Sequence, residues 1–109
     1  MLKNIEKSLV VNLKDQVGYL PGQVSSKTLS QNNNVSITLF SFDKNEEIST
    51  HESKGDAMVT ILDGKARIVI SDKEYYLEEG ESIVMPANQP HSLHAIEQFK
   101  MILTVVFPK

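Results

Sequence analysis

A chain of 109 residues is long enough to form one hydrophobic core and too short for two. Its net charge of −3, without any cluster of lysine and arginine, excludes a surface built for nucleic acid. Cysteine is absent, which excludes disulfide bonds, thiolate metal sites and a cysteine nucleophile.

The sequence shows no sign of export or of membrane insertion. Its first residues lack the apolar core of a secretory signal, and its longest apolar run is far shorter than a membrane span. We therefore expect a cytoplasmic protein that has neither a membrane nor a nucleic acid as a partner. We expect one domain at 1–109, with N-terminal strands at about 1–30 and a barrel core at about 35–107.

Short runs of alternating apolar and polar residues dominate the chain, and only 5–9 suggests a turn of helix. Turn residues separate these runs at the regular spacing that is typical of a sandwich or barrel. In chain order the pattern predicts strands at 9–13, 24–29, 35–42, 48–51, 57–62, 65–71, 74–77, 82–85, 91–96 and 100–107. Nine or ten short strands predict an all-β, antiparallel barrel, because closing the sheet removes its exposed edges.

The pair Asp63-Gly64 lies between two of these apolar runs. A tight hairpin turn needs a positive φ at both central residues, and this dipeptide supplies it at low cost. The sequence therefore predicts a two-residue hairpin that joins strands 57–62 and 65–71.

A rigid bend precedes one of the three histidines. Pro86 and Pro90 each fix φ and remove a backbone donor, so they end one strand and hold His91 at the start of the next. His51 ends an earlier strand, and both rings can face one cavity. His94 has the opposite strand parity to His91, which predicts that it points to the other face of the sheet.

Two stretches around these histidines have the spacing of known sequence signatures. His51 is followed by Gly64 at the distance of the first signature, and Gly80, Pro86 and His91 have the spacing of the second. In these positions the chain resembles the cupins, and in particular their small, single-domain conserved-barrel members. The resemblance implies a cupin-type barrel, also called a double-stranded β-helix or jelly roll.

The chain departs from both signatures at several positions. In the first, Asn45 replaces the leading glycine, Ser53 the second histidine and Ala57 the glutamate. In the second, Asn88 replaces a glycine, which is a mild change because asparagine tolerates a left-handed conformation. Ala95 replaces the final asparagine.

These departures weaken what the resemblance implies about metal binding. Metal-binding cupins use three histidines and a glutamate, and only His51 and His91 remain here as candidate ligands of one divalent ion, Zn, Fe, Mn or Ni. Glu47 and Glu52 are the nearby carboxylates that could complete such a site. Charged residues near turns usually face solvent, and we expect the same of these two.

Three functions stay open at this point. The first is a small cytoplasmic binding protein whose ligand occupies a barrel pocket lined by Ser53, Ala57, Val59, Leu93 and Met101. The second is a metal-dependent enzyme of the dioxygenase or isomerase type that uses His51 and His91 as ligands. The third is a structural or interaction protein without a ligand. Because small cupins usually pair, the resemblance also implies a homodimer.

Overall fold

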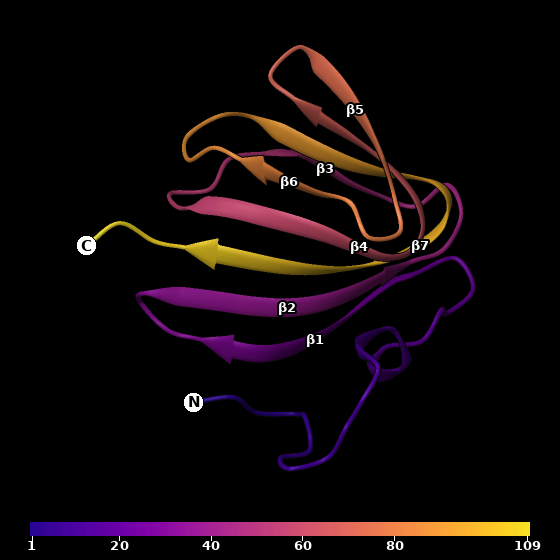
Figure 1. Ribbon diagram of the computed structural model, residues 1–109. Helices are drawn as coiled ribbons and strands as arrows, with labels where there is room; N and C mark the ends of the chain where they lie inside the picture. The colour runs from indigo at the N-terminus through magenta and orange to yellow at the C-terminus, as the bar shows by residue number, and fades with distance from the viewer.

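The computed structural model describes residues 1–109 as an antiparallel sheet that folds over on itself (Figure 1). A short 3-10 helix, η1 (Leu13–Gln16), precedes seven strands. These strands are β1 (Val24–Gln31), β2 (Val35–Phe42), β3 (Glu47–His51), β4 (Asp56–Ile70), β5 (Lys73–Glu78), β6 (Ser82–Met85) and β7 (His91–Val106). The predicted all-β, antiparallel fold is confirmed. The chain contains no helix that could span a membrane.

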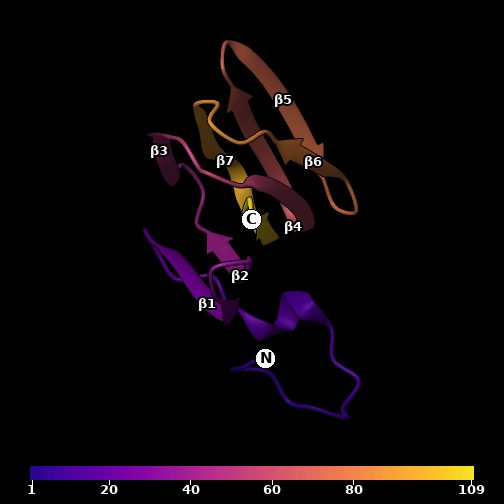
Figure 2. The same ribbon diagram turned by 90° about the vertical axis from the view of Figure 1, so that its left-hand side faces the viewer.

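Strands β4 and β7 are the longest, and they pair with each other along most of their length. The first part of β4 and the second part of β7 lie in one layer with β6, β2 and β1. Their other halves form the second layer with β5 and β3. Viewed from the side, β1 and β2 lie at one end of the sheet and β5 at the other (Figure 2). The two layers enclose the core.

The hairpin predicted at Asp63-Gly64 is wrong, because β4 runs without a turn through both residues. Asp63 pairs with Lys100 and Gly64 with Phe99, and the register shifts on both sides of this pair. Gly64 does adopt the positive φ expected of it, at 78°. That conformation forms a bulge instead of a turn, and it bends β4 from one layer into the other.

The strand predicted at 9–13 is also wrong. The side chain of Asn12 accepts a hydrogen bond from the backbone N–H of Lys14 and caps η1, which starts one residue later. Val17 then packs on Leu29 and Leu39 in a small second cluster on the outside of the first layer. Leu13 and Val17 therefore pack on a sheet face instead of extending the sheet, whereas Leu9 and Val10 are exposed.

The other predicted strands lie where the structure has strands, but some of them are joined into one longer strand. The strands 35–42 and 82–85 have the predicted bounds, and 91–96 and 100–107 are joined in the single strand β7. The turn of helix suggested at 5–9 does not form. Phe42 and Phe99 lie opposite each other across β2 and β7 and stack with ring centroids 4.3 Å apart in the main core.

Candidate functional site

A cavity of about 290 Å³ lies between the two layers and is the most enclosed hollow in the protein. Eight of the twelve residues that line it are hydrophobic. The polar ones are His51, Glu52, Ser53 and His91. Larger hollows elsewhere are open to solvent and mostly polar, such as the one of about 560 Å³ beside the N-terminal segment. An enclosed apolar hollow with a few grouped polar residues is the usual form of a small-molecule site.

His51 and His91 face each other directly across strands β3 and β7. His51 is the last residue of β3, and His91 is the first residue of β7. Their rings meet edge to face with centroids 4.3 Å apart, and the two Nε2 atoms are 3.0 Å apart. His91 is 2% exposed, whereas His51 is exposed. The pair therefore extends from the protein surface into the cavity wall.

Each ring of the pair also makes a hydrogen bond through its other nitrogen. Nδ1 of His51 lies 2.9 Å from the carbonyl oxygen of Ser49, and Nδ1 of His91 lies 3.1 Å from that of Gln89. Each of these carbonyls belongs to the residue two positions earlier in the chain. The local backbone therefore fixes both rings with Nε2 turned toward the partner ring.

Burial sets the protonation of the inner ring. The pKa of His91 lies below its ordinary value of 6.5, chiefly because burial disfavours the charged form and further because His51 lies beside it. The hydrogen bond to Gln89 and the charge of Glu52 act in the opposite direction and are weaker. The inner ring therefore favours the neutral state.

The loop that carries His91 is fastened at both sides. The N–H of Ala87 donates to the carboxylate of Asp56 at 2.9 Å, and the N–H of Asn88 donates to the carbonyl of Ser53 at 2.7 Å. Asn88 adopts a φ of 64° and Asn45 a φ of 71°. Both asparagines stand at signature glycine positions, so the left-handed backbone is kept although the glycines are not.

The structure brings together most of the residues that the sequence singled out for the pocket. Ser53, Ala57, Leu93 and Met101 line the cavity together with both histidines. Val59 does not line it, because it is fully buried one step deeper in the core. Ser53 and Ala57 were selected because they stand at signature positions of the cupin resemblance.

Six residues that line the cavity are not in the predicted set. Glu52, which we expected to face solvent, is exposed and also borders the cavity. The other five extend its apolar wall: Phe40, Ile48, Met85, Leu103 and Val105. Met85 and Val105 are the cross-strand partners of Ala57 on its two sides. Val105 has the same strand parity as Met101, so alternation could have identified it. Met85 reaches the cavity only because β6 pairs with β4, which no local pattern reveals.

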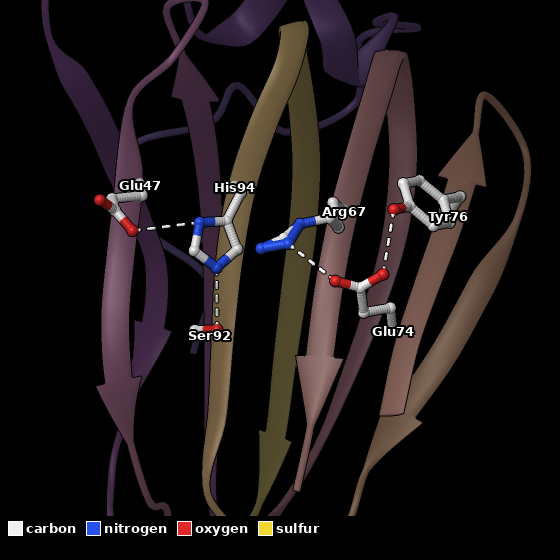
Figure 3. A network of polar contacts seen from close by, with 6 residues as sticks. All are labelled: Glu47, Arg67, Glu74, Tyr76, Ser92 and His94. Carbon is white, nitrogen blue, oxygen red and sulfur yellow. Dashed lines mark hydrogen bonds and ion pairs between the residues drawn. The ribbon is translucent and has the colours of Figure 1, made fainter. Parts of the chain in front are cut away.

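His94 does not line the cavity. Figure 3 shows its ring between Glu47 on β3 and Ser92 on β7. Its Nδ1 is 3.0 Å from a carboxylate oxygen of Glu47, and its Nε2 is 2.9 Å from the hydroxyl of Ser92. We expected Glu47 to face solvent, and it is exposed. A regular strand would nevertheless place it on the same face as His51, four residues later. A register shift between Ile48 and His51 reverses that parity and directs Glu47 outward.

The order Ser92, His94 and Glu47 is that of a hydrolytic triad, but its surroundings do not support catalysis. Ser92 is only 6% exposed, and it lines none of the cavities. Nearby on the same face, Arg67 pairs with Glu74 (Figure 3). We interpret both groups as polar cross-strand contacts that stabilise the outer surface of the second layer.

The donors in the cavity do not fit the metal site that the cupin fold implies. The two histidine Nε2 atoms are close enough to share an ion, but Ser53 and Ala57 occupy the positions of the other family ligands. No group of three or more histidine, cysteine, aspartate or glutamate side chains is placed to hold a metal. Stable sites generally need at least three such ligands. We therefore assign no chemical step to a metal.

Comparisons with known proteins place the chain in a family. The family model described as a cupin domain matches residues 38–107, which is more than half of the chain. No curated protein matches the chain.

Solved structures give a similar result. A conserved protein of unknown function from Streptococcus pyogenes is 48% identical with a TM-score of 0.97, over 99% of this chain and 95% of that one. A cupin superfamily protein from Desulfitobacterium hafniense is 30% identical with a TM-score of 0.95, over 99% of both chains. A cupin 2 conserved barrel domain protein from Leptotrichia buccalis is 40% identical with a TM-score of 0.86, over 88% of this chain and 47% of that one. The sheet that folds over on itself, the two signature histidines and these matches together show that this chain belongs to the cupin superfamily.

Proposed function

We propose that this protein binds a small molecule in the cavity beside His51 and His91. The observation that carries the proposal is the combination of an enclosed volume of about 290 Å³, a wall of eight hydrophobic residues and one cluster of polar groups. Binding sites for small ligands commonly use apolar walls for affinity and a few fixed polar groups for orientation. Here the polar cluster lies where β3 ends and β7 begins.

The cavity suggests how such a ligand is oriented. Leu93, Met101 and Leu103 contribute apolar surface from β7, and Ala57 and Met85 contribute it from β4 and β6. The ligand's apolar part packs against these side chains, and its polar part contacts the histidine pair. Ala57 has a small side chain at this position, which leaves room for the ligand.

The four methionines provide a direct test. Met85 and Met101 are buried and line the cavity, whereas Met1 and Met58 are exposed elsewhere. In protein labelled with ¹³C at the methionine methyls, a small-molecule library should contain compounds that shift the resonances of Met85 and Met101 and leave Met58 unchanged. Compounds that shift only Met1 or Met58, or a library without effect at saturating concentration, would contradict the proposal.

A matched pair of variants completes the test. Ala57→Leu places three more carbon atoms in the cavity, and we expect it to abolish binding while stability changes by about 1–3 kcal/mol or less. Met58→Leu changes the adjacent residue, which is exposed on the outer face, and should leave binding unchanged. Equal binding by both variants would place the ligand outside the cavity.

We also propose that the protein forms a homodimer. Met58 and Val84 lie opposite each other on the outer face of β4 and β6, and both are substantially exposed, at 45% and 51%. Val106 adds a further exposed apolar side chain on β7. Adjacent exposed apolar residues on a sheet support association between copies.

A further inference from the structure

Contacts within the protein already occupy every ring nitrogen of the histidine pair. Nδ1 of His51 lies within hydrogen-bond distance of the carbonyl oxygen of Ser49, and Nδ1 of His91 within that of Gln89. The two Nε2 atoms contact each other at 3.0 Å. The pair therefore forms a fixed part of the cavity wall and leaves no ring nitrogen free to bond a ligand.

The hydroxyl of Ser53 is the polar group of the cavity that keeps a free donor. Its oxygen accepts a hydrogen bond from the N–H of Gly55 at 3.2 Å, and none of the hydrogen bonds in the structure uses its hydrogen. A hydroxyl has one hydrogen to donate besides its acceptor lone pairs. Ser53 is half-buried, so a ligand that fills the cavity separates it from solvent. Such a ligand must offer an acceptor to this hydroxyl, because a buried donor without a partner is costly.

The cavity wall offers no strong partner for a charged ligand. Its twelve lining residues include neither lysine nor arginine, and Lys54 lines a separate hollow with Phe107. Glu52 is the single carboxylate among the lining residues, and it is exposed at the rim. An anion would meet this like charge, and a cation would have only this solvated group as a partner. An apolar enclosure without a paired opposite charge strongly disfavours an ionised group.

We propose that the ligand of this cavity is a small uncharged molecule with an apolar body and an oxygen acceptor, such as a ketone or an ester, and that this oxygen accepts a hydrogen bond from the hydroxyl of Ser53. This inference rests on the proposed binding function and specifies its ligand class. The oxygen-bearing end lies against the histidine pair, and the hydrocarbon end packs on Leu93 and Met101. The available volume is about 290 Å³, and one water occupies about 30 Å³ in the liquid, so a ligand of roughly ten non-hydrogen atoms or fewer fits.

The first test compares two molecules of the same shape. 4-Methylpentan-2-one and 3-methylbutanoate share one branched skeleton, and both are smaller than the size limit of the cavity. They differ in whether a methyl group or a charged oxygen stands beside the carbonyl. Dissociation constants measured near neutral pH from the methyl shifts of Met85 and Met101 should favour the ketone by at least about tenfold. The ketone should stay favoured in Glu52→Gln, because the apolar wall disfavours the charge even without repulsion from the rim.

Variants of two serines test the hydrogen bond. Ser53→Ala removes the donor, and the ketone should bind to it about two- to tenfold more weakly, which is the usual contribution of a hydrogen bond between uncharged groups. Toluene has no oxygen acceptor, so its unchanged affinity would show that the cavity is intact. Ser49→Ala removes an exposed hydroxyl outside the cavity and should bind both compounds like the wild type. Ser53→Thr keeps the hydroxyl, so the ratio of ketone to toluene affinity should stay near the wild-type value.

The outcomes distinguish this inference from the proposed function. Equal or tighter binding of 3-methylbutanoate would overturn the uncharged class, and this comparison in the wild type decides even if Ser53→Ala does not fold. Unchanged ketone binding by Ser53→Ala, or a loss equal to that of toluene, would overturn the role of Ser53. Library compounds that shift Met85 and Met101 but are mainly charged, or lack an oxygen acceptor, would overturn the ligand class and leave the binding function in place. If no compound of any class shifts these two methyls, the proposed function fails as well.

Discussion

His51 and His91 obtain their properties from their positions at the ends of two neighbouring strands. They are direct partners across β3 and β7, and their Nδ1 atoms are held by backbone carbonyls. Their Nε2 atoms are therefore fixed at a cavity wall instead of moving freely in solvent. Pre-positioned polar groups of this kind lose little conformational freedom when a ligand binds.

The buried state of His91 predicts a loss of stability in acid. Its pKa is below 6.5 in the folded protein and is at the ordinary value of 6.5 when unfolded, so the unfolded chain takes up the proton first as pH falls. The free energy of unfolding should therefore keep its full value above about pH 6.5. It should decrease as the pH falls from there toward the lower pKa of His91 in the folded protein. Urea denaturation between about pH 7.5 and 5.5 measures it.

Two variants identify the residue responsible for that decrease. His91→Gln should unfold with a shallower dependence on pH than the wild type, and His94→Gln should keep the wild-type dependence. A decrease that is lost in His94→Gln and kept in His91→Gln would show that the outer histidine is responsible.

The small number of side chains that could coordinate a metal ion predicts weak metal binding. With only His51 and His91 as donors, the cavity lacks the third protein ligand that stable zinc sites generally have. Protein prepared without a histidine tag should contain far less than one equivalent of zinc, iron, manganese or nickel by elemental analysis. One equivalent of any of these metals, lost in the double variant His51→Gln/His91→Gln, would show that the site takes a metal after all.

At the scale of elements, the bend in β4 and β7 shapes the cavity. Gly64 permits the bend because its φ is positive, and a Cβ atom there would overlap the carbonyl oxygen of Gln98 on β7. The hydroxyl of Tyr19 donates to Asp63 at 2.6 Å and fastens the N-terminal segment to the same place. Burial and this bond to Asp63 raise the pKa of Tyr19. The bulge in β4 is thus held by β7 on one side and by the N-terminal segment on the other.

Gly64→Ala should be strongly destabilising. The left-handed backbone costs an alanine about 1–2 kcal/mol, and the overlap with a backbone atom adds about 1–3 kcal/mol. Gly80 is the matched control, because it has a φ of 87° and nothing near the position of a Cβ atom. Gly80→Ala should therefore cost only about 1–2 kcal/mol in chemical denaturation. Similar losses in both variants would mean that the close contact with β7 is unimportant.

The sequence predicted the fold class better than the strand connections. Ser53 and Ala57 were chosen because they stand at signature positions of the cupin resemblance, and both line the cavity. The Asp63-Gly64 pair was misinterpreted, since a hairpin and a bulge both need a positive φ and differ only in distant pairing. The exposure of Glu47 was predicted from the preference of charged residues for solvent. The register shift that separates it from the face of His51 has no local sequence signal.

At the scale of the whole molecule, the two faces of the first layer are used differently. One face forms the core and the cavity wall. The other is covered in part by the N-terminal segment through Val17, which packs on Leu29 and Leu39. Beyond that cover, Met58 and Val84 stay exposed. Strand β1 pairs with β2 of its own chain.

We expect a homodimer that associates through this uncovered face. Light scattering at micromolar concentration should give twice the 12.2 kDa mass of one chain. The double variant Met58→Lys/Val84→Lys should be monomeric, because it places charge on the apolar patch. Tyr76→Lys changes an exposed residue on β5, away from this patch, and should remain dimeric. A monomeric wild type would refute the expectation, and a dimeric double variant would place the contact elsewhere.

The most direct test of the binding cavity is a crystal structure of the protein soaked with the compound that shifts Met85 and Met101 most. The account predicts electron density for the compound between Ala57 and Met101, with its polar group in contact with the His51–His91 pair and its apolar part directed inward. Density for the compound only on the outer surface, or a cavity that holds nothing but water at saturating concentration, would contradict it.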